Sequence, residues 1–353
     1  MASTQESAED VVDSFFNAAS RSASPAPPVS QLEEDTTRMR ISAYKPRSPD
    51  DNTSSILTAF LDNLPQEGKQ NLIPFIATCE DDEILFTLSQ HLKSAILLSL
   101  RTLKTPDVTP SPLPDAEDLV NLVSSEMTRP SDRNSQRKLK KNCLERDGYR
   151  CLVTGYYDYK HGAGKQNDSS NVTGNTDLAH IIPFALGKFR SNDQVGVACS
   201  YETQRARIWA VIYTCFPDVR FHTNCSVATV NDYENLMTLL GPIHQFFGEF
   251  GIAFEPMDEE HTYCIRLYQI PSYILLLIPR PDKNNERVVK FTKHADYELP
   301  SRVLLSTHAA VARILHATGM AKTIDQILRD REELRCLAED GSTDIGRLAL
   351  LAY

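Results

Sequence analysis

The chain has 353 residues and a formal net charge of -10, and 41% of its residues are hydrophobic while 24% are charged. This composition is ordinary for a globular protein of one to three domains, and it excludes a protein coated throughout in basic charge. The acidic balance still leaves room for a local basic patch. The most apolar run, Tyr273 to Pro279, is too short to span a bilayer, so we expect no membrane contact.

The cysteines and the N-terminus indicate the compartment. Eight cysteines are scattered along the chain without a CxxC pair. Residues 1 to 24 carry acidic side chains and no basic segment before an apolar stretch, so they differ from a secretory signal. We therefore expect reduced thiols and an intracellular protein, with cytoplasm and nucleus both left open. We expect no structural zinc, because no set of four ligands has the spacing of a zinc site.

Composition and periodicity divide the first third of the chain. Residues 1 to 50 are rich in Ser, Pro, Asp and Glu, which predicts a disordered tail. Residues 51 to 128 repeat apolar side chains at helical steps, as Ile56 and Phe60 illustrate, so we expect a helical region there. Four prolines between residues 105 and 114 predict a linker inside that region, because proline cannot continue a helix.

A basic stretch follows, from Arg129 to Arg150, where eight basic side chains stand against three acidic ones. Such a stretch is either a solvated helix face or a surface that contacts phosphate. Its place just ahead of the motifs described below favours the second interpretation. The candidate nucleic-acid contacts are Arg137, Lys138, Lys140, Lys141, Arg146 and Arg150.

The pattern changes again in the rest of the chain. Strand and turn signals dominate from residue 151 to about residue 299. Residues 300 to 353 return to helical periodicity, and Gly319 is expected to end one helix. His308 and His316 lie in that apolar helix, and we expect them to be packing residues. This mixture of elements predicts an α+β fold.

Three segments of the central region concentrate residues that suit catalysis: RDGYRCLVTG from residue 146, DLAHIIP from residue 177, and NLMTLLGPIHQFF from residue 235. The second is a short strand that carries His180 and stops at a proline. The third is an apolar strand after Asn235, followed by a helix start at Pro242, with His244 in the first turn. A helix N-terminus suits phosphate because its N–H groups and partial positive charge face outward.

Two imidazoles brought to one such place are what metal-assisted phosphodiester cleavage needs. One neutral histidine removes a proton from water, and a ligand side chain helps to hold a divalent cation on the phosphate. On the residues alone, His180 also fits a satisfied core histidine, and His244 fits a residue of a helix cap.

These three segments, in this order, resemble the HNH nuclease family in its ββα-metal form, and more narrowly the fungal proteins with a central HNH domain of this type. The segment LPSRVLLSTHAAVARILHATG, from residue 299, resembles the helical extension of those proteins. The resemblance implies a ββα-metal HNH core with additional strands, flanked by helical N- and C-terminal regions. Residues 129 to 299 would form the HNH nuclease-like domain, with a long insertion from 184 to 231.

The resemblance also implies a role for each matching residue. His180 stands at the position of the general base, and Asn235 at that of the asparagine that braces the loop. His244 stands at the position of a metal ligand. The implied cofactor is Mg²⁺ or Mn²⁺, and the implied substrate is DNA rather than RNA.

Two positions depart from the family pattern. Ala179 stands directly before the base, where many members carry Asp or His as a metal ligand, and Gly248 follows Phe247, where many carry Asp. Asp177 is the second candidate metal ligand, but in a regular strand it lies about 7 Å from Ala179, so it needs a bend in the strand. These departures keep two rivals open. One is a decayed HNH module that binds nucleic acid or a protein partner without cutting, and the other is a structural interaction protein.

Overall fold

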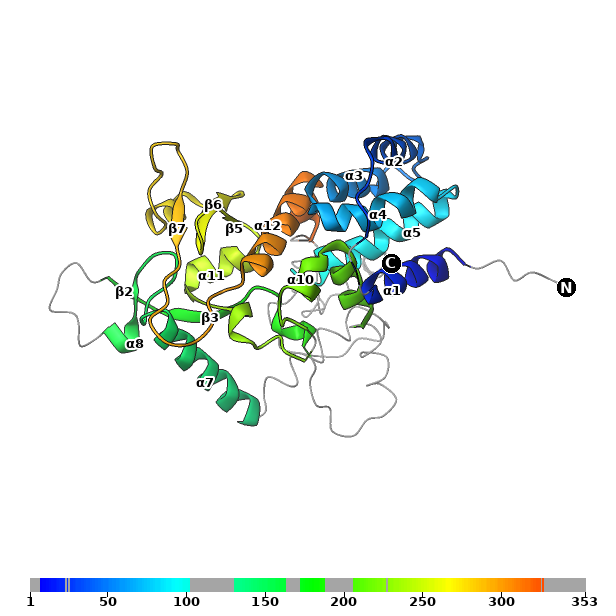
Figure 1. Cartoon of the computed structure of the whole chain (residues 1–353). Coiled ribbons are helices and arrows are strands. Elements are labelled where there is room, and N and C mark those ends of the chain that lie inside the picture. The colour runs from blue at the N-terminus through cyan, green and yellow to red at the C-terminus, as the bar shows by residue number, and fades with distance from the viewer. Residues whose placement is uncertain are drawn as a thin grey trace, which may run out of the picture.

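The computed structural model describes residues 7–22, 24, 26–101, 130–162, 172–187, 206–226, 228–324 and 326. These residues form packed helices and three small sheets, a mixed helix and sheet arrangement compatible with the expected α+β class (Figure 1). The linker expected at 105–114 lies outside the described residues. None of the helices in the described part of the chain combines the length and apolarity needed to cross a membrane.

The N-terminal part of the chain is a group of packed helices. Its helices are α1 (Ala8–Arg21), α2 (Gln31–Ala43), α3 (Thr53–Asn63), α4 (Gln66–Thr78), α5 (Asp82–Leu92) and the π-helical turn η1 (Lys93–Leu98). Helix α2 starts in a capping box, because the Ser30 hydroxyl accepts from the Glu33 N–H and the Glu33 carboxylate accepts from the Ser30 N–H at 2.8 Å. Ile56 and Phe60, which set the expected periodicity, are fully buried.

The disordered tail expected over residues 1 to 50 is wrong for most of that segment. Helix α1 buries Val12 and Phe16 and packs against α5, while α2 buries Ile41 and packs against α3 and α4. Overall composition suggested disorder because the apolar residues are few. On α1 the apolar residues Val12 and Phe16 share one face and are buried. On α2 Ile41 is buried beside Thr37, whereas Leu32 and Met39 stay exposed.

The central part holds the three sheets. The strands are β1 (Tyr157–Asp158), paired in parallel with β2 (Thr173–Gly174); β3 (Thr176–His180), antiparallel to β4 (Leu236–Leu240); and β5 (Ile252–Pro256), β6 (Thr262–Leu267) and β7 (Val288–Lys290), which form an antiparallel sheet. Helix α11 (Gly241–Gly248) follows β4 directly and has Pro242 in its first turn. Two antiparallel strands and one helix therefore pack as one unit, although residues 181–235 separate the two strands in the chain.

Further helices flank this unit. They are α7 (Pro130–Arg146), which packs against β3 and β4, α8 (Tyr159–Gly162), a helix through residues 206–215, α10 (Pro217–Phe221) and the single turns η2 (Phe184–Leu186), η3 (Tyr233–Asn235) and η4 (Ser272–Leu276). The helix of residues 206–215 lies against α4, where the Asn71 amide donates to the Thr214 carbonyl at 2.9 Å. An ion pair of 2.9 Å joins Arg207 to Asp13 of α1. The segment between β3 and β4 thus attaches the N-terminal helices.

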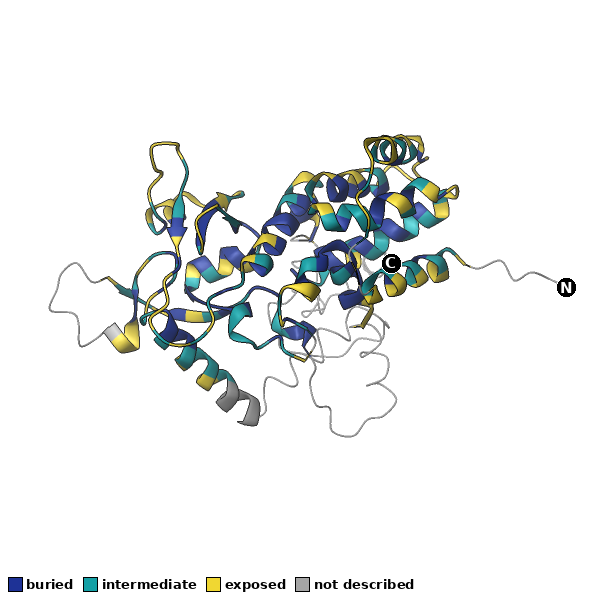
Figure 2. Ribbon diagram, in the orientation of Figure 1, coloured by how far each residue is buried: buried dark blue, intermediate teal, exposed yellow. Residues whose placement is uncertain are grey.

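Helix α12 (Arg302–Ala317) packs against both β5 and α3, so it lies between the sheets and the N-terminal helices (Figure 1). Figure 2 shows buried residues along most of its length. Its end agrees with the expectation for Gly319, which has a φ of 68°, a conformation that suits glycine. His308 is buried and stacks on Phe247 and Phe250, with ring centroids 3.9 and 4.3 Å away. It is a packing residue, as expected.

Candidate functional site

Asp177 on β3 and His244 on α11 lie together on the surface. Asp177 Oδ2 is 3.7 Å from His244 Nδ1, and the two side chains are 52% and 39% exposed. His244 is the main cause that lowers the pKa of Asp177, and the charge of Lys140 adds to it, while burial and the charge of Asp158 oppose them. The site therefore presents an ionised carboxylate and an imidazole that solvent can reach.

Asp177 and His244 come together without a bend in the strand. Strand β3 pairs with β4 in unbroken register from Thr176 to His180, without a bulge. The register places Asp177 opposite Leu239, near the end of β4 from which α11 starts. The first turn of α11 places His244 beside the Asp177 carboxylate.

His180 ends β3 and is half-buried against the ring of Phe184, 5.5 Å away. Its Nε2 lies 2.9 Å from Asn231 Oδ1. An amide oxygen only accepts, so with the Asn231 amide in this orientation Nε2 carries the proton and Nδ1 of the neutral ring has a lone pair. Burial lowers the pKa of His180 to about 4; the Asn231 contact opposes this shift and the charge of His244 assists it. The imidazole is therefore neutral at pH 7.

Asn235 holds the backbone that follows His180. Its side chain is fully buried. Its Oδ1 accepts from the Ile182 N–H at 2.7 Å, and its Nδ2 donates to the carbonyls of Ile182 and Val230, each at 2.8 Å. The Asn235 carbonyl also accepts from the Ile181 N–H at 3.0 Å. Asn235 thus ties the end of β3 to the segment that leads into β4.

Residues 151–255, which contain all of these side chains, match the family model described as HNH endonuclease. This segment has the sequence pattern of an HNH endonuclease domain. No curated protein and no solved structure matches the chain. A match to this family suggests nuclease activity and nucleic-acid binding, and HNH nucleases generally use divalent metal ions. The matched segment leaves the N-terminal helices and α12 outside.

The spacing of the pair bears on whether it could hold a divalent cation. Ligands about 2.1 Å from one octahedral ion are about 3 Å apart when adjacent and about 4 Å apart when opposite. The 3.7 Å between Asp177 and His244 matches neither value, so the two side chains would have to move to bind the same ion. No group of three or more His, Cys, Asp or Glu side chains that could hold a metal occurs in the part of the chain that the structure describes. Asp177 and His244 would therefore be completed by substrate phosphate and water, a common arrangement for Mg²⁺.

Ala179, at the family's additional ligand position, contributes nothing to such a site. It is fully buried, so the side chain directly before His180 faces the core of the HNH domain. Gly248, the second departure, is exposed, and a Cβ atom built there meets nothing within 4 Å. The six described cysteines, Cys151 included, are buried free thiols.

Arg146 is not a surface contact of the HNH domain, and the expectation that it binds nucleic acid is wrong. Its side chain is fully buried. Its five N–H groups donate to both oxygens of the Asp147 carboxylate and to three backbone carbonyls, those of Tyr233, Leu236 and Glu298. A charge count along the sequence cannot show that one member of a basic run turns inward. With every donor satisfied, this arginine stabilises the fold.

The other basic candidates are accessible. Three of them are exposed on α7: Arg137, Lys138 and Lys141. Lys140 is half-buried, and its ammonium donates to the Thr176 carbonyl, next to Asp177. Arg150 is exposed and lies over the ring of Tyr157, 4.0 Å from its centroid. Helix α7 thus brings basic side chains alongside the strand that carries Asp177.

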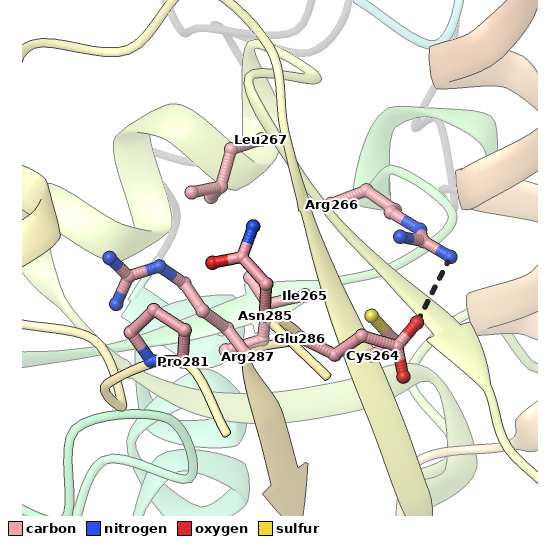
Figure 3. A pocket seen from close by; sticks show the side chains of 8 residues that line it. All are labelled: Cys264, Ile265, Arg266, Leu267, Pro281, Asn285, Glu286 and Arg287. Atoms are coloured by element: carbon pink, nitrogen blue, oxygen red, sulfur yellow. Dashed lines mark ion pairs between the residues drawn. The ribbon is translucent and has the colours of Figure 1, made fainter. Parts of the chain in front are cut away.

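A hollow of about 340 Å³ lies elsewhere, between the end of β6 and the segment leading into β7 (Figure 3). Arg266, Asn285 and Arg287 are among its lining residues, and Arg266 pairs with Glu286 at 3.9 Å. None of the motif histidines lines it. The side chains of Asp177 and His244 instead lie partly exposed at the surface.

Sequence reasoning missed the side chains that orient the site. Asn231, the partner of His180, belongs to no motif and comes from the segment between the two strands. Asp158 is buried and accepts from the Thr176 hydroxyl at 2.6 Å and from His161 Nδ1 at 2.8 Å. A polar residue in a short strand beside a motif is a weak signal, and only the fold shows what such residues touch.

Proposed function

We propose that this chain is a divalent-metal-dependent endonuclease that cleaves the phosphodiester bonds of DNA. The observation that carries the proposal is the convergence of Asp177 and His244 on one surface, with the neutral His180 on the same strand as Asp177. The succession β3, β4 and α11 supports a ββα-metal core. The preference for DNA over RNA rests on the family resemblance.

His180 acts as the general base in this proposal. Asn231 holds the ring through Nε2, so Nδ1 is the atom that takes the proton from the attacking water. Asn235 fixes the backbone after His180 and keeps the ring in place. The low pKa keeps the base unprotonated at neutral pH, although it also makes the imidazole a weak base that needs an activated water.

Asp177 and His244 are the ligands for Mg²⁺ or Mn²⁺ in the proposal. When bound, such an ion would neutralise the phosphate and stabilise the leaving oxygen. Lys140 lies next to Asp177 and would attract the same phosphate. The exposed basic side chains of α7 and Arg150 would bind the phosphates of the DNA strand on either side of the cleaved bond.

Plasmid nicking with a metal titration tests this function. We expect wild-type protein to nick supercoiled DNA in Mg²⁺ or Mn²⁺ and to stop in EDTA. His180→Ala should abolish nicking while DNA affinity stays nearly unchanged, because the base acts on water and contributes little to the ground-state complex. Asp177→Ala should raise the metal concentration needed for activity. Equal nicking by the wild type and His180→Ala would show that another site or a contaminant cuts.

The second candidate is a module that binds nucleic acid or a protein partner without cutting. It is favoured by Ala179, which is buried and leaves two protein ligands at the pair. The same assay separates the two functions. DNA binding without nicking by the wild type at any metal concentration would establish the non-cutting module.

A further inference from the structure

We propose that α8 is a second nucleic-acid contact beside the HNH site, where Lys160 and His161 bind a backbone phosphate of the bound DNA. The proposal rests on the proposed function for the identity of the substrate. Helix α8 follows β1 directly and contacts both β1 and β2. Strand β2 leads into β3, which carries Asp177, and Figure 1 shows α8 next to β2.

The His161 ring is held in one orientation. Its Nδ1 lies 2.8 Å from the Asp158 carboxylate, and its face stacks on Tyr149 with centroids 4.9 Å apart. Asp158 is itself fixed, because it is buried and accepts from the Thr176 hydroxyl at 2.6 Å. A carboxylate only accepts, so Nδ1 carries a proton. Nε2 is the ring nitrogen left for a ligand, and it donates to a phosphate oxygen when the ring is in its doubly protonated, cationic form.

His161 is accessible in spite of these contacts. Its side chain is 41% exposed, and among the described residues Nε2 has no hydrogen-bond partner. A histidine held by a buried carboxylate loses little side-chain freedom when it binds, so its contact with a phosphate is stronger than that of a mobile side chain. The packing therefore leaves one directed nitrogen at the surface.

Short contacts connect α8 to the Asp177–His244 pair. Thr176, which donates to Asp158, is the residue directly before Asp177. The charge of Asp158 acts on Asp177, so the two carboxylates lie within electrostatic range. Lys140 reaches the Thr176 carbonyl from α7. His161 and Lys140 thus flank the start of β3, from α8 and from α7.

The neighbours of His161 on α8 have the character of a strand-binding surface. Lys160 is exposed, and Tyr159 keeps 58% of its surface in water, although it is a large aromatic residue. An exposed ring beside cations is the combination with which proteins stack on bases or sugars and pair with phosphates. The whole chain has a net charge of -10, so a basic face next to the site selects a polyanion by charge complementarity.

The test is a DNA-binding titration at several salt concentrations, with labelled duplex and EDTA to prevent cleavage. The variants are Lys160→Ala, His161→Gln and the double variant, and the matched control is Lys283→Ala. Lys283 is an exposed lysine in the connection between β6 and β7. A melting curve for each variant establishes that it is folded.

We expect Lys160→Ala to bind several-fold more weakly and to lower the slope of log affinity against log salt by about 0.9, the value for one lost phosphate contact. His161→Gln should weaken binding about three- to ten-fold, and Lys283→Ala should change neither quantity. Variants of α8 that match the wild type, or a control that loses as much as Lys160→Ala, would overturn the proposal.

Cleavage, measured separately, distinguishes this proposal from the nuclease itself. A wild type that binds DNA without cutting, with binding weakened in the α8 variants, overturns the nuclease and supports the α8 contact. A wild type that binds no DNA overturns the α8 contact.

Discussion

His180 is held by two asparagines that act in different ways. Asn235 is fully buried and ties three backbone groups together, so it acts on the chain that carries the histidine. Asn231 is half-buried and touches the ring itself. At the scale of single residues, Asn235 therefore supports the fold, whereas Asn231 sets which ring nitrogen of His180 can take a proton.

Substituting each asparagine by alanine should separate stability from activity. Asn235→Ala leaves the N–H and carbonyl of Ile182 without partners in the core and should lower the free energy of unfolding by about 2–4 kcal/mol. Asn231→Ala should leave stability and DNA affinity nearly unchanged and reduce the nicking rate roughly 10- to 100-fold, because the ring loses its orienting partner. Urea denaturation and nicking kinetics measure the two effects. Full nicking activity in Asn231→Ala would show that Asn231 does not orient the His180 ring for catalysis.

At the scale of elements, the motifs located the strands and the helix of the site well. The proline after β3 and Pro242 mark local chain geometry, so they are readable from sequence. The sequence could not show which of these side chains are buried and which are exposed. Ala179 and Arg146 are buried and Asp177 is exposed because α7, β3 and the β4–α11 segment, which are separated in the chain, pack together. Helix α2 was missed because its small buried face gains stability only against α3 and α4.

Helix α12 carries a buried histidine that should make stability depend on pH. Burial lowers the pKa of His308 to about 3, against the opposing hydrogen bond to the Phe247 carbonyl, while an unfolded histidine has a pKa near 6.5. Between these values the unfolded chain binds the proton and the folded chain does not. The free energy of unfolding therefore falls as pH drops below about 6.5, and above that pH the contribution of His308 is complete.

His308→Gln should reduce this dependence. By urea denaturation, the loss of stability between pH 7.5 and pH 4.5 should be smaller than in the wild type by about 2–3 kcal/mol, an order-of-magnitude figure for one such group. His180, whose pKa is also lowered, keeps part of the dependence in the variant. The control is His222→Gln, because that side chain is 64% exposed. Identical pH profiles of His308→Gln and the wild type would contradict the prediction.

At the scale of the whole molecule, the N-terminal helices and the HNH domain pack against each other. Helix α12 lies between them, and the helix of residues 206–215 lies against α4. Gly68 on α4 marks a close approach, because a Cβ atom there would be 2.0 Å from the Cys215 carbonyl oxygen and 2.9 Å from its carbon. We therefore expect the two regions to unfold together.

Gly68→Ala tests this coupling. Both clashing atoms belong to backbone, which cannot turn aside as a flexible side chain does, so one of the two helices must shift. We expect the free energy of unfolding to fall by about 1–3 kcal/mol, in the range of an overpacked core. The matched control is Gly248→Ala at the end of α11, where a Cβ atom meets nothing within 4 Å, so stability should stay the same or rise by about 0.5–1 kcal/mol.

Two probes report on whether the regions unfold as one unit. Trp209, the single tryptophan, is buried in the helix of residues 206–215 and donates to the Leu186 carbonyl at 2.9 Å, so its fluorescence follows the HNH side of the contact. Far-ultraviolet circular dichroism follows all helices, including α1 to α5. If the regions are coupled, both transitions coincide in the wild type and move together in Gly68→Ala. A fluorescence transition that stays at its wild-type midpoint while the helical signal melts early would show that the N-terminal helices unfold independently of the nuclease domain.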